Sequence, residues 1–194
     1  ETAIAFSSYA AKEAEEAIIA NGATLWHIEE NHTPIVAMKW AFRRAGSAYD
    51  QPSKEGTSYI AAAILKEGAG DYDNQAFKYA LENKASYIWF TVDKDYFYVN
   101  VKSLRKHFPF TLEMLATALT KPHVTEDSMA KLVSQIQTSI ESVEESPGRL
   151  ASKLWSETAF AGHPYQYPTY GTRESIVNIT SVSYTHLTLP TRIF

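Results

Sequence analysis

The feature that most constrains the fold is a helical pattern of apolar residues between Glu126 and Glu145. Apolar side chains recur there at intervals of three and four residues, with polar side chains between them, at Met129, Leu132, Val133, Ile136, Ile140 and Val143. This spacing places them on one face of an α-helix, and that face must be buried against another element. The segment therefore predicts a long amphipathic helix that covers a hydrophobic core.

Four β-rich segments predict two hairpins. Residues 23–30 and 34–42 are separated by a short polar turn, and the second segment is apolar enough for a central strand. Residues 85–92 and 96–101 flank the turn sequence Asp-Lys-Asp. The aromatic residues of this second pair predict one packed and one half-exposed sheet face, with an exposed interaction surface as the alternative.

Two shorter helices are predicted between the hairpins. A helix over 57–66 is expected to close at a glycine C-cap in 67–70. Asp73 or Asn74 is expected to cap the next helix, which carries Phe77, Ala80 and Leu81 on one face.

A further helix is predicted over 103–119, where Pro109 either kinks the helix or marks its true start. Leu150 and Leu154 predict another helix after the long one. The order of strands, helices, strands and long helices is typical of an α+β sandwich, in which helices cover a largely antiparallel sheet.

Composition excludes several classes of function. The formal net charge of -4, with scattered basic residues, does not predict a nucleic-acid surface. The absence of cysteine excludes disulfides, thiolate zinc sites and a cysteine nucleophile. No apolar run approaches the roughly 18 residues of a membrane span.

Three segments are expected along the chain. Residues 1–22 are a flexible lead-in, in which 11–20 forms either a short helical turn or flexible chain, and residues 23–180 form the domain. Residues 181–194 ("SVSYTHLTLPTRIF") lack helical or strand periodicity, resemble translated adaptor sequence, and are expected to be a non-native tail.

The residues themselves indicate no catalytic site. No Gly-x-Ser-x-Gly elbow, Gly-x-Gly-x-x-Gly fingerprint or phosphate-binding loop is present. His27 and His32 fall close together, and His163 lies in an aromatic, proline-rich loop. A metal site that uses one of these histidines stays open as an alternative.

Three motifs follow one another along the chain: a strand–turn–strand opening with a Gly-Ser pair, the long helix followed by Pro147, and the His-Pro-Tyr loop from His163. Their order resembles the N-terminal domain of the pitrilysin/insulinase family of zinc peptidases, which includes the mitochondrial processing peptidase. The resemblance covers roughly residues 23–180. It implies a LuxS/metallopeptidase-like α+β sandwich.

Active members of this family carry His-x-x-Glu-His on the first helix and a further glutamate on the long helix, which together bind zinc and activate water. The positions of this sequence that match the pattern are Tyr59, Ala62, Ala63 and Ser139. The resemblance therefore implies that every zinc ligand and the general base are lost. No cofactor is expected in this chain, and zinc is expected only in a partner subunit.

The run "LKEGAGDYDNQAF" after the first helix resembles bacterial non-catalytic subunits in particular. The implied function is a pseudo-enzyme subunit that forms part of a substrate chamber and supports a homologous active zinc peptidase, with a peptide substrate in the shared chamber. The alternative is a structural protein of a larger complex with no role in proteolysis. The resemblance implies the bacterial periplasm if a signal peptide was removed, and otherwise the cytoplasm.

One packing arrangement is expected from the periodicity. Ile60 and Ile64, together with Leu132, Ile136 and Ile140, are expected to lie buried against a sheet that contains Val36, Met38 and Trp40.

Overall fold

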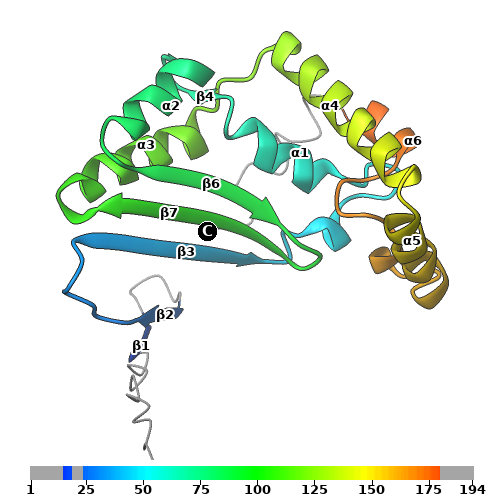
Figure 1. The fold of residues 1–194 in the computed structure, drawn as a ribbon, viewed down its shortest axis with the longest axis horizontal. Coiled ribbons are helices and arrows are strands. Elements are labelled where there is room, and N and C mark those ends of the chain that lie inside the picture. The colour runs from blue at the N-terminus through cyan, green and yellow to red at the C-terminus, as the bar shows by residue number, and fades with distance from the viewer. Residues whose placement is uncertain (1–14, 19–23, 180–194) are drawn as a thin grey trace, which may run out of the picture. The chain divides into compact units, whose positions relative to one another are not determined.

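The computed structural model describes residues 15–18 and 24–179. The chain forms two compact units that divide after Pro34 (Figure 1). The predicted tail over 181–194 and most of the predicted lead-in over 1–22 lie outside the described residues. The segment boundaries expected from the sequence stay predictions.

The first unit contains a short antiparallel pair of strands. Strand β1 (Glu15–Ile18) pairs with β2 (Thr24–His27), so that Glu15 lies opposite His27. The predicted helical turn is therefore wrong over Glu15–Ile18, and the predicted hairpin of 23–30 with 34–42 is also wrong. A few residues with high helix propensity cannot sustain a helix alone, whereas strand pairing satisfies their backbone groups.

The second unit is built on a three-stranded antiparallel sheet in the order β3-β7-β6. Its strands are β3 (Ile35–Arg43), β6 (Tyr87–Val92) and β7 (Tyr96–Leu104). The predicted hairpin of β6 with β7 is confirmed. The prediction that the 34–42 segment is central is wrong, because β7 lies between the other two strands. On β7, Val99 and Val101 are buried, whereas no side chain of β3 is.

The two faces of this sheet differ as the aromatic residues of the second hairpin predicted. Phe90 and Phe97 lie on the buried face with ring centroids 6.2 Å apart. Tyr87 and Trp89 are exposed on the other face. On that open face the Lys39 amino group lies 4.0 Å from the centre of the Tyr98 ring.

Three helices cover the buried face of the sheet (Figure 1). They are α1 (Thr57–Ile64), α2 (Asn74–Glu82) and α3 (Phe108–Thr120). The α+β class is therefore confirmed. The Asp73 carboxylate caps α2 by accepting a 2.8 Å hydrogen bond from the Ala76 amide, so Asp73 is the cap of the two that were predicted. Helix α3 has Pro109 in its first turn, so the proline marks the true start.

The glycines after α1 do not form the predicted C-cap. They belong instead to a small hairpin of β4 (Gly68–Ala69) with β5 (Tyr72–Asp73). The Gly70 amide donates to the Lys121 carbonyl at 2.7 Å, which ties this hairpin to the end of α3. The glycines are therefore used for a turn between two helices, with φ +134° at Gly68 and +56° at Gly70.

Three further helices form the other end of the second unit (Figure 1). They are α4 (Glu126–Glu144), α5 (Pro147–Ala159) and α6 (Arg173–Val177). Short 3-10 turns occur at Ser47–Tyr49, Arg105–His107 and Pro164–Gln166. The long helix and the helix after it are confirmed. No helix in the described ranges combines the length and apolar content needed to cross a membrane.

The apolar stripe of the long helix is buried as expected, but it does not pack against the sheet strand that was expected to cover it. Its apolar stripe joins α1 and the α6 region in a hydrophobic cluster of buried residues, which we call the isoleucine cluster: Ile60, Ile64, Leu132, Ile136, Ile140, Ile176 and Ile179. Met38 packs instead against a separate cluster between the sheet and α1–α3, and Trp40 is 39% exposed. The periodicity of the long helix fixed which face is buried, and not which element covers it.

Three buried hydroxyl groups connect the sheet to α3. The Thr111 hydroxyl lies 2.8 Å from that of Ser86 and 3.0 Å from that of Ser103, and it donates to the His107 carbonyl at 2.9 Å. All three side chains are at most 1% exposed. Because buried hydroxyls are costly without partners, this network favours one position of α3 on the sheet.

Candidate functional site

Helix α1 carries three of the four positions that the family resemblance assigns to the zinc motif. Tyr59 and Ala63 are four residues apart and so lie one turn apart on the helix. Tyr59 is 39% exposed and Ala63 is half-buried. Ala62 is only 4% exposed and packs into the cluster between the sheet and the helices. The helix thus offers a phenol and two methyl groups at these positions.

The fourth position, Ser139, lies on α4. Helices α1 and α4 pack together through Ile60 and Ile64 on one side and Ile136 and Ile140 on the other. Ser139 is exposed, and its hydroxyl donates to the Gln135 carbonyl of the preceding turn at 2.9 Å. The two helices that carry the motif positions are therefore in contact, while the Ser139 hydroxyl is hydrogen-bonded within its own helix.

These four residues do not fit a zinc ion. Zinc in proteins is bound by thiolate, imidazole or carboxylate groups, and a catalytic site needs three of them. A neutral phenol and a hydroxyl are poor ligands, and alanine has no donor atom. In the described part of the chain, no three His, Asp or Glu side chains are grouped so as to hold a metal.

A residue that the sequence analysis did not single out positions α1. The Asp50 carboxylate accepts hydrogen bonds from the Gly56 amide at 2.9 Å, the Ser58 amide at 3.1 Å and the Ser58 hydroxyl at 2.5 Å. The residue at the N-cap position itself, Gly56, has no side chain to do this. Asp50 therefore caps α1 from a distance of six residues. In the sequence, this acceptor is indicated only by the glycine at the N-cap position, which has no side chain to accept hydrogen bonds from the first turn of α1.

The Asp50 carboxyl is in an unusual electrostatic environment. Burial raises its pKa to about 6, against the opposing effect of the hydrogen bonds from Ser58 and Gly56. A carboxylate at the start of a helix is also favoured by the helix dipole. Asp50 is a positioning residue for α1, since its acceptor atoms are occupied by the helix itself.

The segment before α1 is also held by α6. The Ser175 hydroxyl donates to the Glu55 carbonyl at 2.7 Å. Gly171 has φ +84°, and a Cβ atom there would lie 2.2 Å from the Glu55 carbonyl oxygen. Only glycine permits this approach of two backbone segments. The start of α1 is thus fixed by contacts from Asp50 and from the α6 region.

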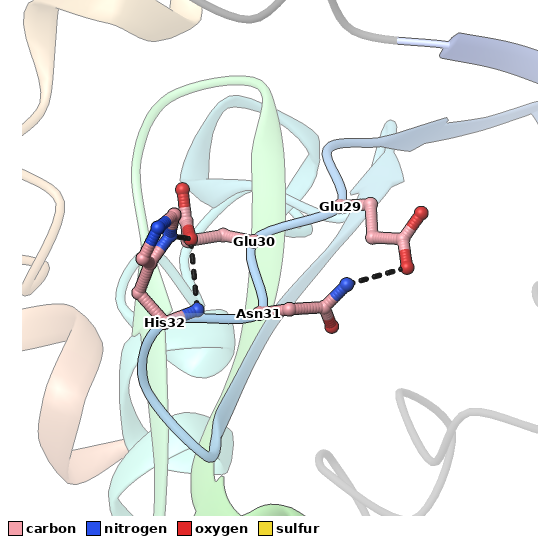
Figure 2. Close-up of polar contacts among 4 residues, drawn as sticks. All are labelled: Glu29, Glu30, Asn31 and His32. Atoms are coloured by element: carbon pink, nitrogen blue, oxygen red, sulfur yellow. Dashed lines mark hydrogen bonds and ion pairs between the residues drawn. The ribbon is translucent and has the colours of Figure 1, made fainter.

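The histidines do not form an alternative metal site in the described ranges. His32 lies in the loop after β2, where its amide donates to Glu30 at 3.0 Å and its ring contacts the same carboxylate (Figure 2). In the same loop the side-chain amide of Asn31 donates to the Glu29 carboxylate at 2.8 Å (Figure 2). This loop is a set of local contacts between neighbours in the sequence, and it gathers no third ligand.

His163 belongs to an aromatic cluster instead. Its ring centre lies 4.7 Å from that of Tyr165, and its Nδ1 accepts a 3.2 Å hydrogen bond from the Tyr165 amide. The Tyr165 hydroxyl donates to Asp95 at 2.7 Å, which raises the pKa of Tyr165 to about 12. His163 therefore shapes the loop that carries it.

Comparison with known proteins identifies the family. The model of the insulinase family, peptidase family M16, matches residues 28–173. The chain belongs to the insulinase family. This assignment confirms the resemblance drawn from the motifs.

Two curated proteins are similar to this chain over most of its length. The chain is 26% identical over 152 residues to the non-peptidase homolog YmxG of Helicobacter pylori, covering 78% of this chain and 35% of the relative. It is 20% identical over 138 residues to the uncharacterized zinc protease YmxG of Bacillus subtilis, covering 71% of this chain and 34% of the relative. The chain thus spans about a third of the length of these curated relatives.

Two solved structures share the fold. The inactive peptidase M16 domain from Pseudomonas fluorescens matches with a TM-score of 0.83 and 24% identity, covering 90% of this chain and 42% of that one. A protease from Helicobacter pylori matches with a TM-score of 0.79 and 15% identity, covering 92% and 43%. These likenesses confirm the insulinase-family fold of the sheet and its helices.

Proposed function

We propose that this chain is a non-catalytic part of an insulinase-family peptidase, which forms part of the wall of a substrate chamber and supports an active zinc-binding partner. The proposal rests on one observation, which concerns the packing of α1 with α4 and the side chains at the motif positions. The two helices pack together and α1 is held at its start by Asp50, yet Tyr59, Ala62, Ala63 and Ser139 supply no zinc ligand. The packed pair of helices is present, but the side chains at these four positions cannot bind zinc.

The burial of Ala62 supports the same proposal. A general base at this position would place a carboxylate where the side chain is 4% exposed and surrounded by apolar residues. An unpaired buried carboxylate is costly, so the surroundings of α1 favour alanine at this position. The names of the Helicobacter relative and of the Pseudomonas domain agree with a non-catalytic role. The name of the Bacillus relative, a zinc protease, makes the test necessary.

The first experiment measures zinc and cleavage. After dialysis, we expect metal analysis of the purified chain to find no stoichiometric zinc, and a quenched fluorescent peptide to stay intact. One tightly held zinc per chain, with cleavage that a chelator abolishes, would contradict the proposal.

A gain-of-metal variant tests whether the scaffold is retained. Tyr59→His, Ala63→His and Ser139→Glu together restore two imidazoles and one carboxylate without burying a charge at position 62. We expect this triple variant to bind one zinc. The matched control is Gln75→His with Tyr79→His, which places two histidines four residues apart on the exposed face of α2 with no third ligand.

The supporting role requires a second measurement with an active homologue encoded beside this protein. We expect the mixture to form a stable complex and to cleave peptide faster than the homologue alone. A complex without any change in cleavage would instead favour the structural role.

A further inference from the structure

A groove at the end of the second unit has a lining that the proposed function does not use. It has a volume of about 640 Å³ and lies between α5, the turn that joins β6 to β7, and residues 166–170. Three basic side chains line it, Lys94 from the turn and Arg149 and Lys153 from α5. We call this the basic groove.

The basic groove is positively charged, although the chain as a whole carries a net negative charge. None of its described lining side chains is acidic, whereas the chain has a formal net charge of -4. Asp93 and Asp95 lie on either side of Lys94, and their carboxylates keep their charge while they accept hydrogen bonds from Tyr98 and Tyr165. The described lining itself therefore carries positive charge only.

The three cations are held to different degrees. The Lys94 amino group donates to the Tyr167 carbonyl, which fixes it at the groove wall, and burial lowers its pKa. Lys153 lies 4.0 Å from Glu157, a pair too exposed and too long to neutralise it strongly. Arg149 is exposed on the first turns of α5. Arg149 and Lys153 are thus the cations best placed to meet a ligand.

The remaining lining is suited to a peptide. Ser152, Ser156 and Gln166 offer hydroxyl and amide groups that both donate and accept hydrogen bonds, as a peptide backbone requires. The volume lies within the range of ligand pockets and far exceeds that of one small anion. Arginine binds carboxylate groups with two parallel hydrogen bonds.

We propose that the basic groove binds an acidic peptide segment, whose carboxylates pair with Arg149 and Lys153 and whose backbone contacts the serine and glutamine side chains. The lining of the site includes Val143 of α4 but none of the motif positions Tyr59, Ala62, Ala63 and Ser139. It therefore stands or falls independently of the proposed function.

The experiment is a fluorescence anisotropy titration of the 194-residue chain with a labelled peptide of alternating Asp and Glu. The same peptide with Asn and Gln is the uncharged comparison. We expect saturable binding of the acidic peptide only, weakening as salt rises from about 50 to 300 mM because screening strengthens over that range. Equal binding of both peptides would overturn the proposal.

Matched variants locate the site. Arg149→Gln with Lys153→Gln should weaken binding roughly threefold to thirtyfold, the range expected for two exposed charge contacts. Lys78→Gln with Lys131→Gln removes the same charge from exposed positions on α2 and α4 outside the groove, and should leave affinity within about twofold. Circular dichroism checks that both variants keep the fold. Equal losses in the two double variants would show a general charge effect and overturn the site.

Inorganic phosphate serves as competitor and separates a peptide site from a small-anion site. We expect phosphate to compete only as added salt does, with sodium chloride of the same ionic strength as the reference. Displacement by phosphate at far lower concentration than by chloride would assign the groove to a small anion and overturn the peptide assignment.

Discussion

At the scale of single residues, Asp50 connects the stability of the chain to pH. The pKa of its carboxyl is raised to about 6 in the folded chain from an ordinary value of 3.8, so the folded state binds this proton more tightly than the unfolded state. The contribution of this group to stability is therefore largest below about pH 4, falls as pH rises through about 6, and is constant above about pH 7.

We expect Asp50→Asn to remove this dependence. The free energy of unfolding of the original chain, relative to the variant, should fall by about 2 kcal/mol between pH 4 and pH 6.5. Urea denaturation at several pH values measures it. Asp71→Asn on the exposed turn between β4 and β5 is the matched control, and a parallel pH profile for Asp50→Asn and the original chain would refute the assignment.

Gly171 allows a second test at this scale. Alanine there would adopt a strained φ near +84° and meet the Glu55 carbonyl at 2.2 Å. We expect Gly171→Ala to cost more than about 2 kcal/mol, since left-handed strain alone costs about 1–2. Gly148→Ala in α5, where nothing lies within 4 Å of an added Cβ, should instead stabilise by about 0.5–1 kcal/mol. Thermal unfolding of both variants compares them.

At the scale of elements, the isoleucine cluster joins α4 to α1 and the α6 region. Ile136 is 4% exposed at its centre. We expect Ile136→Ala to destabilise the chain by about 2–5 kcal/mol and Ile136→Val by about 0.5–1.5. Gln135→Ala, on the exposed face of the same helix, should change stability by less than about 0.5 kcal/mol. Chemical denaturation measures all three, and a neutral Ile136→Ala would mean that α4 does not cover a core.

At the scale of the whole molecule, the division after Pro34 predicts where a protease cuts. Residues 28–34 connect the two units, have no regular strand or helix, and are exposed. Exposed segments of this kind are cleaved before packed elements. We expect a glutamate-specific protease to cut after Glu29 or Glu30 and to leave a stable fragment that begins near Asn31. Mass spectrometry identifies the fragment, and Glu29→Gln with Glu30→Gln should abolish it. A first cut within α1–α4 would contradict the division into units.

The sequence by itself determined the elements that depend on local patterns. The stripe of α4 and the β6–β7 hairpin were predicted. The Asp73 cap of α2 and the start of α3 at Pro109 were each one of two predicted alternatives. Each depends on periodicity or on the chemistry of one or two neighbouring residues, which a single sequence displays directly. The family resemblance likewise depends on the order of short motifs, and it is confirmed over residues 28–173.

Only the tertiary structure decided which elements meet. β3 pairs with β7 across more than fifty residues, because these strand partners are chosen by the fit of whole faces and not by nearness in the sequence. The same holds for Ile136, whose periodicity showed that it is buried but not that Ile60 and Ile176 cover it. Asp50 acts on α1 through a loop whose path no local pattern specifies. Contacts between distant segments depend on the path of the whole chain. The residues that hold α1 in place could therefore be identified only in the structure.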